Sequence, residues 1–282
     1  MTITTEILDK IGFLRNNLLI SKNSTNSFPD FLGIGAQKSG TTWLYKNLRE
    51  HPQLYLPETK EIHFFDWHFY KSIHWYYKHF KDADISQCKG EITPCYSVLS
   101  ENKIRFIQKM NPKLKIILLL RNPIERAWSH AVMNLAKRTK TEINFAIIDL
   151  VSIIKLAKRK KKKEIHLIKD EEFIAHFNHS RSIERGNYLK IIRMWKNYFP
   201  SEQIFIGDYN QLKKSPQKLL NEVFNFLEVK KITDWNEYPL KSKINITETK
   251  NNKASDKLQE YLSKLYINDL KELKKEIPTI KW

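Results

Sequence analysis

Cysteine and glycine are both scarce in this chain: 282 residues contain two cysteines, Cys88 and Cys95, and seven glycines. Two neighbouring cysteines are too few for the disulfide framework of a secreted domain, so we expect a reduced, cytoplasmic chain. No run of eighteen apolar residues occurs, and we therefore expect no membrane-spanning helix. The first twenty residues carry Glu6 and Asp9 within their apolar stretch, which predicts an amphipathic helix and not a signal peptide.

Acidic residues are outnumbered by basic ones, 31 against 49, which gives a formal net charge of +18. Such an excess favours an anionic partner, which includes nucleic acid, acidic polysaccharide, a membrane surface or a nucleotide. Most of the basic residues are lysine, a skew that an AT-rich genome would also produce. The charge therefore permits an anionic partner without identifying one.

The order of apolar patterns predicts an α/β fold, with a central parallel sheet flanked by helices. The length fits one domain spanning residues 1–282. Within it we expect a helical extension at residues 1–30 and an insertion at residues 137–185, on the binding side of the sheet. The expected strands are 31–34, 115–120 and 203–206, and the expected helices are 42–50, 101–110, 123–135, 186–198, 216–227 and 256–276.

A phosphate-binding loop is predicted at residues 35–42, GAQKSGTT, between an apolar strand pattern and a helical one. Its glycines have the spacing of the triphosphate loop GxxxxGK[ST], but Thr41 stands where the lysine belongs, and the lysine of this loop is Lys38. A strand, a turn and a helix N-terminus together offer backbone N–H groups and a positive dipole end to an anion. A tight turn without a ligand is the alternative interpretation.

A second anion site is predicted where residues 115–120 end at Arg121. This near-continuous apolar run is typical of a strand buried on both faces, and ligands of open α/β sheets bind at the carboxyl ends of such strands. Arg121 can form a forked contact with a phosphate, and Ser129, about two turns along the next helix, can donate a hydroxyl hydrogen bond. The alternatives are a strand-end ion pair for Arg121 and an ordinary surface serine for Ser129.

The two segments together, QKSGTTWL at 37–44 and LLRNPIERAWSH at 119–130, resemble the sulfotransferase family. The resemblance extends to most of residues 31–282 through KEIHFFD at 60–66, HWYYKHF at 74–80, GEITPCY at 90–96, RGNY at 185–188 and FNFL at 224–227. It is nearer to the heparan-sulfate-type and bacterial carbohydrate sulfotransferases than to the aryl and steroid branch. It implies sulfuryl transfer from 3′-phosphoadenosine 5′-phosphosulfate to a hydroxyl or amine acceptor, with carbohydrate favoured, and neither a metal nor a nucleic-acid partner.

The resemblance also implies which residues hold the donor. Lys38 would approach the bridging oxygen, where charge builds up in the transition state. The 5′-phosphate would contact the loop and the 3′-phosphate would contact Arg121 and Ser129. Trp43 has two interpretations, contact with the donor or packing on the helix face. The full expected set is Lys38, Ser39, Gly40, Thr41, Thr42, Trp43, Arg121 and Ser129.

On the acceptor side, the resemblance places the general base at Glu61. His63 is the alternative base, because an unperturbed imidazole titrates nearer neutrality. Lys60 is expected to bind the sulfonate or phosphate, and His63 and Asp66 are expected to contact the acceptor or orient the base. Nearby cations lower a carboxyl pKa and burial raises it, so the sequence leaves the pKa of Glu61 open.

Residues 63–80 hold four histidines among many aromatic residues, and three interpretations stand. One is a metal site from His63, His68, His74 and His79, although their spacing does not match a zinc pattern. Another is an aromatic platform that stacks sugar rings. The third is ordinary core packing of most of the aromatic side chains.

Two other functional classes compete with sulfuryl transfer. A nucleotide kinase or NTPase would use the same loop, but the lysine missing at Thr41 argues against it. A non-enzymatic polyanion binder would use the lysine run at residues 158–163, which by default is a solvated charge run. Lys250 and Lys253 loosely match a basic loop that closes over the 3′-phosphate in related enzymes.

Overall fold

The computed structural model describes residues 3–19, 28–137, 168–241, 254–280 and 282. Five parallel strands form one sheet in the order β2-β3-β1-β4-β5. The strands are β1 (Phe31–Gly35), β2 (Leu54–Tyr55), β3 (Cys88–Ile92), β4 (Lys115–Leu120) and β5 (Ile204–Asp208). The predicted α/β fold with a central parallel sheet is confirmed.

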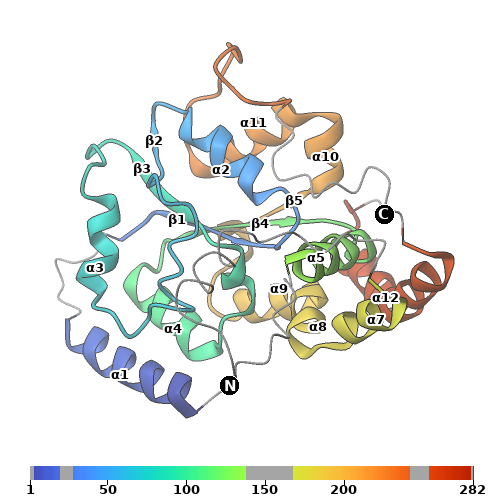
Figure 1. The fold of residues 1–282 in the computed structure, drawn as a ribbon. Coiled ribbons are helices and arrows are strands. Elements are labelled where there is room, and N and C mark those ends of the chain that lie inside the picture. Colours follow the sequence, from blue (N-terminus) through green and yellow to red (C-terminus); the bar gives the residue numbers. More distant parts are fainter. Residues whose placement is uncertain (1–2, 20–27, 138–167, 242–253, 281) are drawn as a thin grey trace, which may run out of the picture.

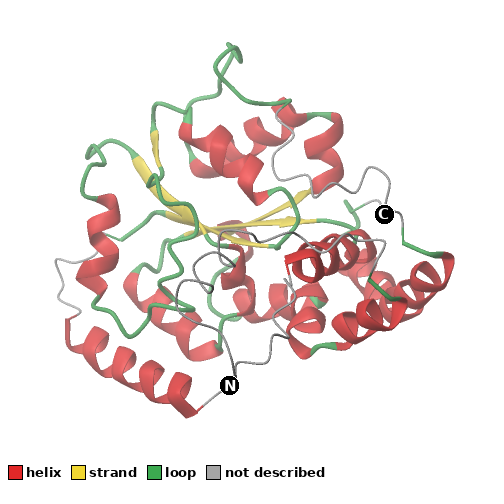
Figure 2. Cartoon of the chain, in the orientation of Figure 1, coloured by secondary structure: helices red, strands yellow, loops and turns green. Residues whose placement is uncertain are grey.

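Helices cover both faces of the sheet (Figures 1 and 2). One face carries α2 (Thr41–Arg49), α10 (Tyr209–Lys214) and α11 (Pro216–Leu227). The other carries α4 (Glu101–Met110), α5 (Pro123–Lys137), α7 (Asp170–Asn178), α8 (Ser180–Gly186), α9 (Tyr188–Lys196) and α12 (Asp256–Glu276). At one edge lie α1 (Ile3–Leu19) and α3 (Ile73–Tyr77). Short 3₁₀ turns lie at Lys78–Phe80, Pro94–Val98 and Ser201–Gln203.

Strand β4 shows why its sequence is apolar throughout. Ile116, Leu118 and Leu120 pack into the core below the sheet with α4 and α9. Ile117 and Leu119 pack into the core on the other face, against α2 and α11. Because successive side chains of a strand point to opposite faces, a strand covered on both sides needs apolar residues at every position.

The elements that were predicted match the described ones to within one or two residues, but the strands β2 and β3 and the short helices α3, α7, α8 and α10 were missed. Strand β3 reads CKGEI and lacks an apolar run. Its Gly90 admits the Phe31 ring of β1, since a Cβ there would lie 2.2 Å from Phe31 Cζ. Its Glu91 is buried to 2% exposure. Tertiary contacts, not local pattern, make this segment a strand.

Glu91 is the hub of a buried hydrogen-bond network. Its Oε1 accepts from the hydroxyls of Tyr76 (2.8 Å) and Tyr96 (2.9 Å), and its Oε2 accepts from Thr93 Oγ1 (2.7 Å). Burial raises the pKa of Glu91, and the three hydroxyl donors offset part of that rise. Tyr96 Oη also accepts the backbone N–H of Phe64 at 2.9 Å. The network therefore ties β3 to the segment at residues 61–66.

The structure describes part of the two segments for which an N-terminal helix and an insertion were predicted. Helix α1 confirms the helix expected in the first twenty residues. Within the expected insertion, residues 168–185 form α7 and most of α8, and these helices pack against α5 and α12. The lysine run at 158–163 lies outside the described residues, as do Lys250 and Lys253. Among the described helices, none combines the length and apolar character needed to cross a bilayer.

We expect Glu91→Gln to lower the free energy of unfolding by about 1–3 kcal/mol, because the amide nitrogen cannot accept and at least one buried hydroxyl loses its acceptor. Urea denaturation measures the change. Glu237→Gln, at an exposed position, is the control and should stay within about 0.5 kcal/mol of the unmodified chain. Equal stability of the two variants would contradict the role of the network.

Candidate functional site

The predicted phosphate-binding loop connects β1 to α2 in the centre of the sheet. Gly35 and Gly40 have φ of 153° and 88°, values that favour glycine. Gly40 is the N-cap of α2, and no side chain caps this helix. A Cβ at Gly40 would lie 2.5 Å from Leu212 Cδ1 of α10, so the loop is also packed closely. The helix start is thus shaped to offer backbone N–H groups to an anion.

Lys38 lies at the tip of this loop with a left-handed backbone, φ 72°. Its carbonyl oxygen accepts a hydrogen bond from Arg121 Nη1 at 3.3 Å. Its Nζ lies 3.7 Å from Met133 Sδ on α5. The loop lysine therefore lies between the carboxyl ends of β1 and β4 and the helix that follows β4.

The two predicted anion stations meet at neighbouring strands. Ala36 N donates to Leu119 O at 2.7 Å, which joins the loop to the end of β4. Arg121 follows directly, and its Nε and Nη2 each lie 3.0 Å from Glu125 Oε2. Its guanidinium also lies 4.6 Å from the centre of the Tyr209 ring. The structure thus shows the strand-end ion pair at the position where an anion was predicted.

The other expected donor contacts differ in burial. Ser39 is fully buried, Thr41 is 5% exposed, and Thr42 and Ser129 are half-buried. Trp43 is buried in the core between α2 and α11, and its Nε1 donates to Leu240 O at 3.0 Å. These contacts favour the packing interpretation of Trp43, and its contact with a donor stays a prediction.

The predicted acceptor residues lie together in one chain of charged groups. Lys60 Nζ contacts Glu61 Oε1. Glu61 Oε2 lies 3.5 Å from His63 Nε2, and His63 Nδ1 lies 2.8 Å from Asp66 Oδ2. The imidazole is therefore placed between two carboxylates, with Lys60 at the outer end.

These contacts shift the pKa values of Glu61 and His63 in opposite directions. Burial raises the pKa of Glu61, but the hydrogen bond from His63 and the charge of Lys60 outweigh it and lower the pKa to about 2. Burial lowers the pKa of His63, but Asp66 and Glu61 outweigh it and raise the pKa to about 9. These pKa values favour a Glu61 carboxylate and a His63 imidazolium at neutral pH.

The backbone at these positions is unusual. Among the described residues, four non-glycine residues have positive φ: Lys38 (72°), Glu61 (65°), His63 (55°) and Glu228 (61°). Glu228 is the C-cap of α11, where a left-handed residue is common. The other three are the residues for which the sequence predicted a catalytic role. Left-handed strain of this kind is concentrated at functional sites.

Cys95 and Arg185 complete the site, although the sequence assigned neither a role. Arg185 Nη2 lies 3.9 Å from Cys95 Sγ. Burial raises the pKa of Cys95, and the Arg185 charge offsets part of the rise. One atom each of His63, Asp66 and Cys95 lies within 4.8 Å of the others, a spacing that a metal ion could use. The Asp66–His63 hydrogen bond and the neighbouring Arg185 compete with such an ion.

Several basic side chains lie close to one another near the phosphate-binding loop. Arg126 on α5 is fully buried, and its Nη2 donates to Ser182 O at 3.3 Å. His130, one turn further on, is 4% exposed. Burial lowers the pKa of His130 to about 3, reinforced by the charges of Arg126, His176, Arg185 and Lys38. The centre is therefore a cationic environment that favours an anion.

Most of the aromatic side chains of residues 63–80 lie in the core, and one lies at the surface. Phe64, Phe65, Phe69, Tyr76 and Phe80 are buried and form part of the main core, so core packing is confirmed for most of the segment. Trp67 is the exception: it is 63% exposed and stacks on His63, with ring centres 3.5 Å apart and planes inclined by 7°. His74 and His79 contact Ser72 and the backbone of α3, and do not join His63 in a metal cluster among the described residues.

Comparisons with known proteins point to one family. The family model described as Sulfotransferase domain matches residues 28–277. The chain is 28% identical to the membrane-associated sulfotransferase kil1 of Dictyostelium discoideum, over 74% of this chain. It is 31% identical to the heparan sulfate glucosamine 3-O-sulfotransferase 3B1 of Mus musculus, also over 74% of this chain. The chain spans 58% and 48% of these two relatives, about half of their length.

A solved sulfotransferase from Alicyclobacillus acidocaldarius shares the fold, with a TM-score of 0.64 and 21% identity. The match covers 89% of this chain and 96% of that one.

The predicted cytoplasmic location, in contrast, is wrong on these comparisons. One relative is named as membrane-associated and others are named as heparan sulfate enzymes. A low cysteine count therefore did not determine the compartment.

We expect the His63 imidazole to titrate near pH 9, staying protonated at neutral pH and losing its charge above that value. Asp66→Asn should lower this pKa by about one unit or more, because it removes a carboxylate in direct contact. Nitrogen-detected NMR of the imidazole follows the titration. Asp82→Asn, at an exposed position, is the control and should leave it unchanged. A His63 pKa near 6.5 in the unmodified chain would contradict the arrangement.

Proposed function

The chain belongs to the sulfotransferase domain family, and on this premise we propose that it transfers a sulfuryl group from 3′-phosphoadenosine 5′-phosphosulfate to a carbohydrate hydroxyl or amine. The observation that carries the catalytic assignment is the backbone of Lys38, Glu61 and His63. These three residues hold most of the positive φ values found among the described non-glycine residues. Strained backbone persists where surrounding contacts hold a functional geometry.

The donor is proposed to bind at the start of α2. An uncapped helix N-terminus at Gly40 suits a phosphate, and the cationic environment behind the loop supports the same assignment. The donor supplies an activated bond between sulfur and a phosphate oxygen. Lys38, at the tip of the loop, would neutralise the charge that grows on that oxygen when the bond breaks. Ser39, Thr41 and Thr42 would hold the 5′-phosphate.

The 3′-phosphate is proposed to bind at Arg121 and Ser129. Arg121 lies at the carboxyl end of β4 and already holds one carboxylate, Glu125, with Nε and Nη2. A phosphate would compete with Glu125 for this fork, since the guanidinium pairs both groups with the same geometry. Ser129 on α5 would add a hydroxyl donor. The insertion at residues 137–185 remains a predicted part of the acceptor side.

Glu61 is proposed as the general base. The acceptor O–H or N–H gives its proton to the Glu61 carboxylate while the acceptor atom bonds to sulfur and the sulfur–phosphate bond breaks. His63, as imidazolium, donates to Glu61 and is oriented by Asp66. A carboxylate with a pKa of about 2 is a weak base. We propose that Lys60 turns to the sulfonate or phosphate, which removes one cation from Glu61 and makes it more basic.

The acceptor is proposed to be a carbohydrate. Several relatives are named as heparan sulfate sulfotransferases. In this chain, the exposed Trp67 ring lies stacked on His63, beside the proposed base. An exposed indole face next to a catalytic group is suited to pack against the apolar face of a sugar ring.

We expect Glu61→Gln to bind 3′-phosphoadenosine 5′-phosphate as the unmodified chain does, but to lose about 100-fold or more in kcat, because only proton acceptance is removed. Isothermal titration measures the binding, and transfer of radiolabelled sulfate to glycans measures turnover. Glu58→Gln, at an exposed neighbouring position, is the control and should keep full activity. Retained turnover in Glu61→Gln would remove Glu61 as the base. If the unmodified chain does not bind 3′-phosphoadenosine 5′-phosphate, the proposed donor is wrong.

We expect Trp67→Ala to raise KM for the glycan acceptor about three- to tenfold, the size of one aromatic stacking contact, with nucleotide affinity unchanged. Trp67→Phe keeps an aromatic face and should recover part of the loss. Steady-state kinetics with the acceptor varied at saturating donor measures the effect. An unchanged acceptor KM, or an equal loss of nucleotide affinity, would contradict the platform.

A further inference from the structure

Helix α1 presents an apolar row to the outside of the molecule. Ile7, Ile11, Leu14 and Leu18 recur at spacings of four, three and four, which places them on one face of a helix. All are exposed, Leu14 to 70% and Leu18 to 86%. With Leu8, they are five of the nine large apolar side chains that are exposed among the described residues. Figure 1 shows α1 at the outer edge of the fold.

The opposite face of α1 packs on the protein through polar or small residues and through the ring of Phe13, which contacts Phe69 and Phe106. Asn16 is fully buried, and its side chain donates to Phe69 O (3.0 Å) and accepts from Ile73 N (2.7 Å). Asp9 pairs with the buried Lys103 at 2.8 Å. A Cβ at Gly12 would lie 2.4 Å from Phe69 O. These contacts fix the rotation of the helix, so that Ile7, Ile11, Leu14 and Leu18 face outward.

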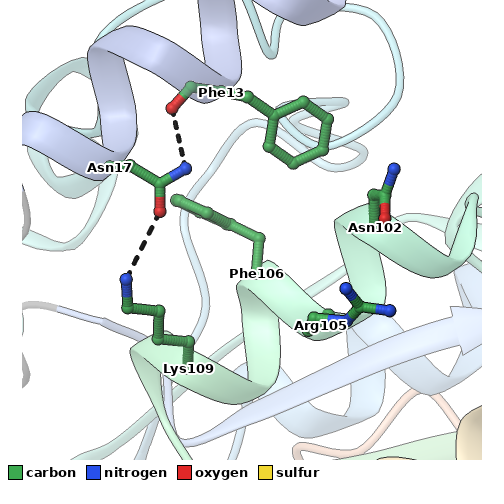
Figure 3. Close-up of a pocket in the computed structure, with 6 residues that line it drawn as sticks. All are labelled: Phe13, Asn17, Asn102, Arg105, Phe106 and Lys109. Atoms are coloured by element: carbon green, nitrogen blue, oxygen red, sulfur yellow. Dashed lines mark hydrogen bonds between the residues drawn. The ribbon is translucent and has the colours of Figure 1, made fainter.

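Cations flank the row on both sides. Lys10 and Arg15 are exposed and, at 100° per residue, lie on opposite sides of the row. Figure 3 shows Lys109 of α4 reaching the side chain of Asn17 on α1, at 3.5 Å, with Arg105 one turn away. Glu6 is the one exposed acid among the described side chains of α1, because Asp9 is held by Lys103.

We propose that α1 docks this protein on the surface of an anionic lipid bilayer through the row Ile7, Ile11, Leu14 and Leu18. A helix with an apolar row between cations lies in the plane of the interface, with its apolar side chains among the acyl chains and its cations at the headgroups. A second copy of the chain fits less well. Five side chains on one convex helix offer less than the ~800 Å² per partner of a stable interface. A symmetric pair would also bring the same cations together.

The test uses the full chain and vesicles of phosphatidylcholine, with and without phosphatidylglycerol. The unmodified chain should sediment with the anionic vesicles. The double variant Leu14→Ser with Leu18→Ser should lose at least about tenfold in partitioning, because two exposed apolar side chains are removed. Ile267→Ser, which changes an exposed isoleucine on α12, is the matched control and should bind as the unmodified chain does. Equal thermal midpoints and equal nucleotide binding show that the variants are folded.

Three results would overturn the proposal. The first is no sedimentation of the unmodified chain with anionic vesicles. The second is binding that high salt abolishes and that the double variant leaves unchanged, since this would be lysine attraction alone. The third is dimerisation in light scattering that the double variant abolishes, without vesicle binding, since a second copy would then cover the row.

Discussion

The candidate site depends on one buried carboxylate. Glu91 lies in β3 next to β1, and three hydroxyl groups donate to it in a space that water does not reach. The hydroxyl of one of them, Tyr96, also accepts a hydrogen bond from the backbone N–H of Phe64, which lies between His63 and Asp66. Thr93 Oγ1 also accepts from His63 N, at 3.5 Å. The left-handed turn of Glu61 and His63 is therefore anchored to the sheet itself, which is what a strained backbone requires.

The site contains two arrangements of charged residues, and these arrangements have different effects. Behind the loop, Lys38, Arg126 and Arg185 form a cationic environment in which the buried His130 stays neutral. On the acceptor side, Lys60, Glu61, His63 and Asp66 alternate in sign, so each ionised group has a neighbour of opposite charge. The first arrangement suits a bound anion, and the second favours the ionised form of the Glu61 carboxylate. Cys95 and Arg185 lie where the two meet.

Patterns of neighbouring residues in the sequence predicted those parts of the site that short continuous segments form. The loop at 35–42 and the end of β4 at Arg121 were found from contiguous residues, whereas the segment with Glu61, His63 and Asp66 was identified through its resemblance to the sulfotransferase family. Strand β3 was missed because Gly90 and Glu91 are stabilised by Phe31 and Tyr76, which are remote in sequence. The charge of His63 was also beyond the sequence, since it depends on the 2.8 Å contact with Asp66. Arg185 needed the fold to bring α8 to Cys95.

Helix α1 shows a further limit of periodicity. The acidic residues within its apolar stretch predicted an amphipathic helix, which the structure confirms, and an apolar row on such a helix normally faces a core. Periodicity gives the existence of a face but not its direction. Here the direction follows from Gly12 and Asn16, since only a small residue fits against Phe69 O and only a buried amide satisfies the backbone of residues 69–73. The helix is held by these polar contacts and by the packing of Phe13 on Phe69 and Phe106, whereas Ile7, Ile11, Leu14 and Leu18 are exposed.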